Sequence, residues 1–441
     1  MLATQNHGVA LRQDLSLRLA DARRRTDELF SLVHSDSLYD RPIPERHRIL
    51  FYVGHLEAFD WNLLGQRVFG LKRFHPEFDR LFAFGIDPVG GGLPDDQPSD
   101  WPAREKVYEY AGNIRRLLDE HLRQDVSPAR YDEFPLSTLL NVAIEHRLMH
   151  AETLAYMLHQ LPLDRKTPSA QTHSKETEPV QPRMIEIPAG MITLGLEHSA
   201  AFGWDNEYEL HTAHVPAFAI DQYEVTNGQF LEFLQAGAYQ GKDLWSDDDW
   251  NWITASGISH PAFWKRSGDE WLYRGMFSET PLLLNAPVYV SHAEARAYCR
   301  WAGKDLPTEA EWQRAAYGSE SGSQRAYPWG NDAPHGLLGN FDFSSWNPTP
   351  VNSFPSGNSA FGVADLLGNG WEWISTPFAP FTGFEPFPFY RGYSADFFDG
   401  QHFVMKGGSA RTAACMLRRS FRNWFQPHYQ YVYAGFRCVT R

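Results

Sequence analysis

The sequence predicts a multidomain α+β protein, with a four-helix bundle followed by a second domain of short strands and helices. Its 441 residues are too many for one ordinary domain. Apolar residues recur at helical spacing through about the first 160 residues, whereas short apolar segments alternate with Gly, Pro, Asn and Trp after residue 183. Between these parts, residues 163–183 are polar, contain proline and lack periodicity, as expected of a linker. We therefore expect domains at 1–162 and 184–441.

Four segments of the first domain have the periodicity of amphipathic helices, and their lengths favour a four-helix bundle. They span residues 15–33, 44–70, 103–122 and 136–161. Pro44 suits the first turn of the second helix, where its missing N–H has no bond to make. Residues 85–102 are rich in Gly, Pro and Asp and are expected to form an irregular loop. In the second domain, short helices are expected at 291–303 and 308–318.

Composition and charge restrict the class of protein. The chain is 43% hydrophobic and 15% aromatic, which indicates a folded protein with aromatic-lined cores or pockets. Its net charge of −14 argues against a nucleic-acid surface. The sequence has no run of about 18 apolar residues and no apolar signal region, so we expect a cytoplasmic protein without membrane contact. Three cysteines, Cys299, Cys415 and Cys438, are too few for a disulfide framework.

Two histidines in the last helix of the bundle suggest a metal site. His146 and His150 are four residues apart, so an α-helix places both imidazoles on one face. Glu152 points elsewhere and is better placed to support a ligand than to act as one. A third ligand must come from another helix. His55 is the candidate, because it lies on an otherwise apolar stripe where a buried imidazole needs a partner.

The apolar stripe consists of Phe51, His55 and Phe59, and it would turn His55 into the bundle. Three neutral imidazoles converging there would make a facial metal site with open positions for a substrate and O2. The pattern alone does not choose iron over zinc. Histidine pairs at this spacing are also common on helices that bind no metal. Three further histidines, His47, His121 and His159, compete as ligands.

Sequence motifs in both halves carry a family resemblance. The segments "GHLEAFDW" and "EHRLMHAE" resemble the DinB-like bundle of ergothioneine-type sulfoxide synthases. The second half resembles the formylglycine-generating-enzyme (sulfatase-modifying factor) fold, a relative of C-type lectins. Its motifs are "IPAGMITLG", "YEVTNGQF", "LPTEAEWQRAAYG", "YPWGN", "DLLGNGWEW", "KGGSA" and "AGFRC". The resemblance covers nearly the whole chain, and the order and fusion of the two domains are highly specific.

The resemblance implies a mononuclear non-haem Fe(II) site held by His55, His146 and His150. The implied substrates are O2 and hercynine, the trimethylated betaine of histidine, and the product has a new bond from imidazole C2 to sulfur or a related chalcogen. Hercynine's quaternary ammonium cannot donate a hydrogen bond, so aromatic faces and carbonyl dipoles would hold it. The family pattern places Asn423 and Trp424, in "SFRNWFQPHY", at this group. Without the resemblance, a core aromatic and a turn residue would explain the pair.

The sequence departs from the sulfoxide synthases at three places. Phe425 stands where relatives that use a dipeptide thiol have an acidic residue after the Asn-Trp pair. The bundle loop, residues 82–102, contains no tyrosine, whereas cysteine-using relatives carry tyrosines there. Met149 stands before His150, where some relatives use Gln to contact the substrate. These departures favour the related selenoneine synthase branch, which joins selenium from a selenosugar to hercynine.

Loop residues Asp87, Asp95, Asp96 and Gln97 offer acceptors for a sugar, although an ordinary solvated loop explains them equally well. A hercynine sulfoxide synthase of ergothioneine biosynthesis, using cysteine or glutamylcysteine, remains the alternative. A formylglycine-generating enzyme proper fits poorly, because Cys415 and Cys438 are 23 residues apart and Cys438 is expected in the core. A non-catalytic, metal-free lectin-like binding protein is the alternative from another class. The motifs identify neither a catalytic proton donor nor an oligomeric state.

Overall fold

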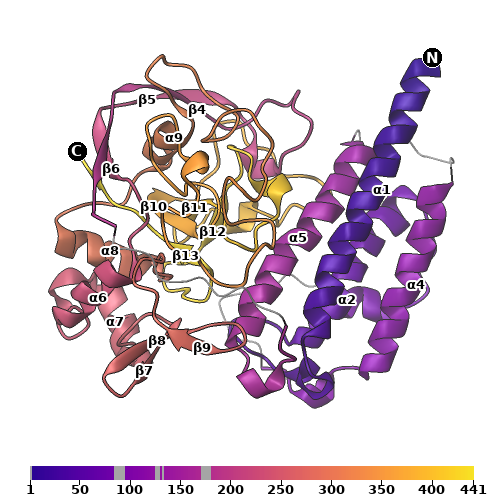
Figure 1. Cartoon of the computed structure of the whole chain (residues 1–441). Helices are drawn as coiled ribbons and strands as arrows, with labels where there is room; N and C mark the ends of the chain where they lie inside the picture. The colour runs from indigo at the N-terminus through magenta and orange to yellow at the C-terminus, as the bar shows by residue number, and fades with distance from the viewer. Residues whose placement is uncertain (1, 84–94, 125–129, 132–133, 170–179) are drawn as a thin grey trace. The chain divides into compact units, whose positions relative to one another are not determined.

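A computed structural model describes residues 2–83, 95–124, 130–131, 134–169 and 180–441 (Figure 1). The chain divides into two compact units, residues 1–169 and 170–441. The division falls within the stretch that the sequence predicts as a linker. The first residues of that stretch belong to the bundle, because Thr167 N–H donates to Leu32 O at 2.8 Å and the Lys166 ammonium donates to Leu158 O at 3.0 Å.

The first unit is a helical bundle with four long helical segments (Figure 1). Its helices are α1 (Leu2–Ser31), α2 (Ile49–Asp60), which continues as the π-helix η2 (Trp61–Val68), the short α3 (Pro76–Leu81), α4 (Arg104–Arg123) and α5 (Leu136–Gln160). A two-residue hairpin, β1 (Arg130–Tyr131) with β2 (Phe134–Pro135), precedes α5. Helix α1 packs along α5, and α2 packs along α4 and α5. The four-helix bundle predicted from periodicity is therefore present.

The predicted start of the second helix at Pro44 is wrong. Helix α2 begins at Ile49 with Arg48 as its N-cap. Pro44 instead lies in a turn closed by the Arg46 N–H, which donates to Ile43 O at 3.0 Å. The Arg48 guanidinium donates to Tyr39 O at 2.7 Å and to the Asp96 carboxylate at 2.8 Å. These long-range bonds hold residue 48 in an extended conformation and outweigh the local preference of the proline.

A buried ion network joins the two helices at the centre of the bundle. Arg147 on α5 is fully buried and donates to Glu57 Oε1 at 2.9 Å and to Asp60 Oδ2 at 2.7 Å, both on α2. It also donates to the Leu56 carbonyl at 3.0 Å. Burial alone would raise the pKa of Glu57, but Arg147 and Arg115 outweigh it and lower this pKa to about 2. The carboxylate is therefore ionised and paired, and it fixes α2 against α5.

The second unit is an α+β domain with small sheets and short helices. Its largest sheet has the order β12 (Asn423–Phe425), β11 (Phe403–Gly407), β10 (Trp371–Pro377), β13 (Ala434–Gly435), with β10 and β13 parallel. A three-stranded sheet has the order β14 (Val439–Thr440), β6 (Phe218–Asp221), β3 (Met184–Ile187). The other sheets are β4 (Gly190–Leu194) with β5 (His211–Val215), and β7 (Trp264–Ser267), β8 (Glu270–Arg274) and β9 (Glu279–Pro281).

The helices of the second unit begin at side-chain caps that the sequence encodes. They are α6 (Asn227–Gln235), α7 (Asp247–Ser256), α8 (His292–Ala302) and α9 (Glu309–Tyr317). The "SHAE" and "TEAE" segments form capping boxes, in which Ser291 and Thr308 accept from the backbone three residues on. The two helices predicted from these segments, α8 and α9, are thus present.

Two of the second domain's sequence motifs meet through a buried ion pair. Arg437 of "AGFRC" donates to Glu372 of "GNGWEW" through Nε at 2.6 Å and Nη2 at 2.7 Å. The indole N–H of Trp312, from "TEAEW", donates to the same carboxylate at 2.9 Å. All three side chains are fully buried. The motifs therefore specify the core of this domain, whatever else they do.

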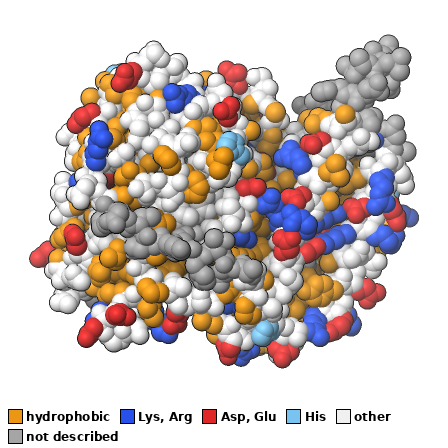
Figure 2. Space-filling model, in the orientation of Figure 1, with side chains coloured by type: hydrophobic (Ala, Val, Ile, Leu, Met, Phe, Trp, Pro, Cys, Tyr) orange, Lys and Arg blue, Asp and Glu red, His pale blue; other side chains and the backbone are white. Residues whose placement is uncertain are grey.

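The drawn face of the bundle carries charged side chains of both signs (Figure 2). Acidic and basic side chains are interspersed on the face of the bundle drawn in Figure 2, so the net charge of −14 is not gathered into one strongly charged patch on that face. Among the described residues, no helix has the length and apolar character needed to cross a membrane.

The Arg147 network generates a stability prediction. Replacing Arg147 by Met leaves the buried Asp60 with only Arg23, 4.0 Å away, and the buried Glu57 with only Arg115, so we expect the bundle to lose about 3–5 kcal/mol. Hydrogen exchange of α2 and α5 peptides, read by mass spectrometry, reports the free energy of opening for this unit alone. The control is Arg116→Met, because Arg116 forms an exposed 3.0 Å pair with Glu120 and should matter by less than about 0.5 kcal/mol. Equal effects of the two changes would contradict the prediction.

Candidate metal centre

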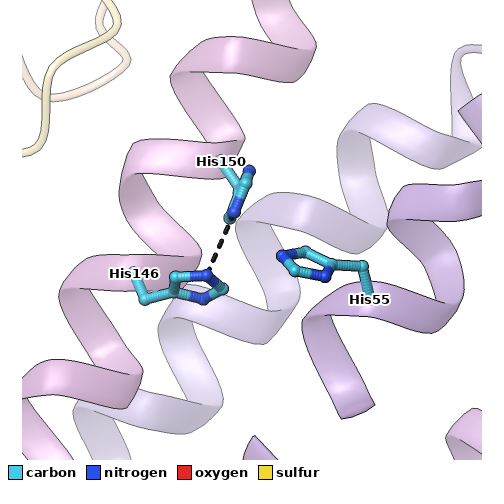
Figure 3. Close-up of side chains that lie close together, drawn as sticks. All are labelled: His55, His146 and His150. Carbon is cyan, nitrogen blue, oxygen red and sulfur yellow. Dashed lines mark hydrogen bonds between the residues drawn. The ribbon is translucent and has the colours of Figure 1, made fainter. Parts of the chain in front are cut away.

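Three imidazoles meet inside the bundle (Figure 3). His55 comes from α2, and His146 and His150 come from successive turns of α5. Each is no more than 4% exposed. One nitrogen from each ring lies within 4.8 Å of the corresponding nitrogens of the other two. The spacing of four residues within α5 and the packing of α2 on α5 together produce this convergence.

The hydrogen bond of His55 fixes which of its nitrogens faces the other two rings. Its Nδ1 lies 2.7 Å from the Phe82 carbonyl oxygen. A carbonyl only accepts, so Nδ1 carries the proton and Nε2 keeps a lone pair. Within the described structure, Nε2 is buried and has no hydrogen-bond partner. A buried acceptor in this state is costly, and a bound cation would satisfy it.

The two histidines of α5 complete the donor set. Their Nε2 atoms are 3.1 Å apart (Figure 3). Two nitrogens that each lie about 2.1 Å from a common cation, at nearly a right angle, are separated by about 3 Å. His146 stacks on Phe59 with ring centroids 3.5 Å apart, and Tyr52 presents its ring to His150 edge-on at 5.8 Å. The residues present therefore fit a metal ion.

Burial sets the charge of the three rings. Desolvation lowers the pKa of His55 to about 4 and holds the pKa values of His146 and His150 well below the usual range. The neighbouring Arg147 guanidinium acts in the same direction. At neutral pH all three imidazoles are neutral, which is the form that binds metal ions.

The three competing histidines are not part of the group formed by His55, His146 and His150. His47 is stacked on Phe51 with centroids 4.1 Å apart, and the Nδ1–H of His121, on α4, donates to the Leu117 carbonyl at 2.8 Å. His159 is buried further along α5. Among the residues that the structure describes, only His55, His146 and His150 form a group of three or more His, Cys, Asp or Glu side chains close enough to share a metal.

The remaining residues predicted in the first domain lie on α5 and in the bundle loop. Met149 is half-buried beside His150, and Glu152 is 7% exposed. Asp96 pairs with Arg41 and Arg48 and accepts from the Trp101 indole at 2.6 Å, so it anchors the loop. Two other sugar-acceptor candidates, Asp95 and Gln97, are exposed, and Asp87 lies outside the described residues.

The predicted substrate residues of the second domain lie on strand β12. Trp424 stacks on Phe378 with centroids 4.1 Å apart and an interplanar angle of 7°, and Tyr393 approaches it edge-on at 5.4 Å. The Asn423 side-chain oxygen accepts from the Trp424 backbone N–H at 2.9 Å. Phe425 stacks on Tyr429. One face of the Trp424 ring is thus covered by packing within the domain.

Sequence reasoning missed two features of the chain. The Phe82 carbonyl that orients His55 is 27 residues from it in sequence, and a backbone group leaves no residue-type signal. The second feature is that Cys438 lies next to Cys299, with sulfur atoms 3.5 Å apart, although 139 residues separate them in sequence. Both partners are buried, at 0% and 3% exposure, and burial raises the pKa of the Cys438 thiol. The predicted core position of Cys438 is observed.

Comparison with known proteins supports the two-domain reading. The DinB superfamily model matches residues 18–154, and the sulfatase-modifying factor enzyme 1-like domain matches residues 169–441. The hercynine oxygenase of Mycolicibacterium smegmatis is 35% identical over 97% of this chain and 99% of its own length. That of Mycolicibacterium thermoresistibile is 32% identical over 98% and 96%. The hercynine oxygenase of Mycobacterium tuberculosis is 39% identical over 53% of this chain and 55% of its own length.

The fold and these matches define a two-domain protein in which a DinB-like bundle precedes a sulfatase-modifying factor domain. The chain belongs to the family that includes the relatives named hercynine oxygenase.

The donor set generates a prediction about metal content. Replacing His55, His146 or His150 by Ala should remove most of the metal from protein purified without an affinity tag, because two nitrogens hold a divalent ion much less tightly than three. Inductively coupled plasma mass spectrometry measures this directly. Replacing Glu152 by Gln should weaken affinity by a smaller amount, about 10–100-fold. The control is His47→Ala, which should keep the metal. Full metal in His55→Ala together with loss in His47→Ala would show that the ligand has been misassigned.

Proposed function

We propose that the protein is a mononuclear non-haem iron enzyme that uses O2 to form a carbon–chalcogen bond at imidazole C2 of hercynine. The bond proposed is C–Se, with a selenosugar as donor, as in a selenoneine synthase. The observation that carries the proposal is the set of three buried neutral imidazoles, in a chain that matches hercynine oxygenases along nearly its whole length.

Fe(II) is proposed because three protein nitrogens leave coordination positions for a substrate and O2. Zinc also accepts three histidines, but it has no redox chemistry, and the relatives' name denotes an oxygenase. When bound, the iron would supply the O2 activation that makes the imidazole C2–H reactive. The chain's own part is to present three neutral nitrogens and to exclude bulk water, which their burial achieves.

Asn423 and Trp424 are proposed to bind the trimethylammonium group of hercynine, and Met149 to contact the substrate beside His150. A quaternary ammonium has no N–H to donate, so an aromatic face and an amide oxygen are the fitting partners. The stack on Phe378 holds the Trp424 ring in a fixed plane. A ring fixed in advance loses little side-chain entropy when the cation binds.

The main support for a selenosugar donor is Phe425, the residue that follows Asn423 and Trp424. A glutamylcysteine would lose the carboxylate that pairs with its ammonium group, because Phe425 is apolar and packed on Tyr429. That charge-assisted bond is worth about 1.5–3 kcal/mol. A hydroxyl-rich selenosugar needs no fixed charge, and Asp95 and Gln97 are exposed acceptors. The name of the relatives favours a second candidate, a hercynine sulfoxide synthase of ergothioneine biosynthesis using cysteine or glutamylcysteine.

A panel of donors tests the choice of chalcogen. With hercynine and O2 supplied, we expect a selenosugar to give the C2–Se product with a higher kcat/KM than cysteine or glutamylcysteine gives a sulfoxide. Mass spectrometry of the products provides the measurement. Restoring an acid with Phe425→Asp should leave selenosugar use unimproved. If a thiol is the better donor, the sulfoxide-synthase assignment replaces this one, and iron-free protein that turns over no donor would favour the metal-free lectin-like binding protein.

The role of Trp424 predicts a loss of discrimination between hercynine and histidine. Replacing it by Leu removes the cation–π contact, worth about 0.5–2 kcal/mol, so the preference for hercynine should fall by about 2–30-fold. Isothermal calorimetry with both ligands measures this ratio. The matched control is Phe397→Leu, which thins the same aromatic cluster but leaves the Trp424 ring in place. If both variants reduce the ratio equally, Trp424 serves packing and not ammonium binding.

A further inference from the structure

We propose that Gly54 and Phe82 form a positioning device for the metal centre. The Phe82 ring packs against the backbone of Gly54, and this contact positions the Phe82 carbonyl oxygen to accept a hydrogen bond from His55 Nδ1. The device thereby selects the tautomer of His55 that leaves Nε2 available to a cation. The proposal rests on the metal-binding part of the proposed function and is independent of the substrate.

The first observation is the lack of space at Gly54. A Cβ atom there would lie 2.5–2.6 Å from the Cδ1, Cγ and Cδ2 atoms of the Phe82 ring. The ring therefore lies directly on the backbone of α2, one residue before the ligand His55. Phe82 is fully buried, and its ring also neighbours Phe78 at 5.5 Å. Since a buried aromatic ring cannot easily move aside, only glycine is compatible with this packing.

The second observation is the carbonyl itself. Phe82 is the C-cap residue of α3, so its carbonyl lies beyond the last helical turn. Its oxygen accepts from His55 Nδ1 at 2.7 Å. The bond gives this carbonyl a donor and fixes the proton on Nδ1 at the same time. Without it, the proton could move to Nε2, and the lone pair that faces His146 and His150 would be lost.

The third observation is that α3 is itself held in place. The Tyr110 hydroxyl, on α4, donates to Asp79 Oδ1 on α3 at 2.7 Å, and both residues are buried. The position of the Phe82 carbonyl is therefore set from two sides, by α4 through Asp79 and by α2 through Gly54. Phe82 and Gly54 act through His55 and do not touch the metal, so they are positioning residues.

The chain offers a matched pair of glycine variants for the test. Gly54→Ala drives a Cβ into the Phe82 ring. Gly65→Ala, in the π-helical continuation of the same helix, drives a Cβ to 2.4 Å from Cε3 of the buried Trp61 ring. Both changes insert one methyl group against a buried aromatic ring of the bundle. Only the first displaces a residue whose carbonyl bonds to His55, so a general packing effect would appear in both.

Two measurements test the positioning device without relying on enzymatic activity. The first is the tautomer of His55 in the metal-free full-length protein, read from long-range ¹H–¹⁵N spectra with labelled histidine and assigned by the loss of signals in His55→Gln. Wild type and Gly65→Ala should show the Nδ1–H form, and Gly54→Ala a mixture. The second is the affinity for Fe(II) or Co(II), measured against a competing chelator. It should fall by about 10–100-fold in Gly54→Ala and stay unchanged in Gly65→Ala.

The result that would overturn the proposal is equal metal affinity in the two variants, or a persistent Nδ1–H tautomer in folded Gly54→Ala. If Gly54→Ala does not fold, the wild-type spectrum and Phe82→Leu decide. An Nε2–H form of His55 in wild type overturns the device, and so does an unchanged tautomer in Phe82→Leu. Because neither readout uses hercynine or a chalcogen donor, a failed donor panel would refute the proposed reaction and leave this inference standing.

Discussion

The buried pairing of Arg147 with Glu57 and Asp60 is the interaction on which the candidate site depends. It joins α5 to α2 next to the histidines that those helices carry, so it sets how far His55 lies from His146 and His150. A charge buried without partners would be very costly, so the network tolerates little sliding of one helix past the other. Metal ligands need their positions held to within a fraction of an ångström, and a rigid ionic clamp beside them provides this.

The second domain is organised by the same kind of constraint. Arg437, Glu372 and Trp312 tie three sequence motifs into one core. The four-stranded sheet built on that core carries β12, and with it Asn423 and Trp424. Many of the family's motif residues in this domain therefore specify its core, and only a few remain to contact a ligand. This explains why proteins with different activities can share these motifs, as fold and function are separable.

The sequence predicted the bundle, the position of His146 and His150 on one helix, and helices α8 and α9, because each depends on local periodicity or capping. The burial of His55 close to His146 and His150 was predicted from the apolar stripe that its imidazole interrupts. The start of α2 at Pro44 was wrong, because the long-range contacts of Arg48 decide it. Neither the Phe82 carbonyl nor the closeness of Cys299 to Cys438 could be predicted, since both follow from how distant segments pack. The burial of one Trp424 face was hidden for the same reason.

The neutrality of the three imidazoles has a consequence for the charge of an occupied site. Among the residues that the structure describes, no carboxylate belongs to the group that could share a metal, so the three imidazoles would offset none of the charge of a divalent cation in a medium of low dielectric constant. The ionic network next to it is paired within itself, since Glu57 binds Arg147 and Arg115, and Asp60 binds Arg147 and lies 4.0 Å from Arg23. Anions are therefore the natural further ligands of such an ion, since each one that enters reduces an uncompensated field. A thiolate, a selenolate or a substrate carboxylate would be attracted by this field more strongly than a neutral molecule of the same shape.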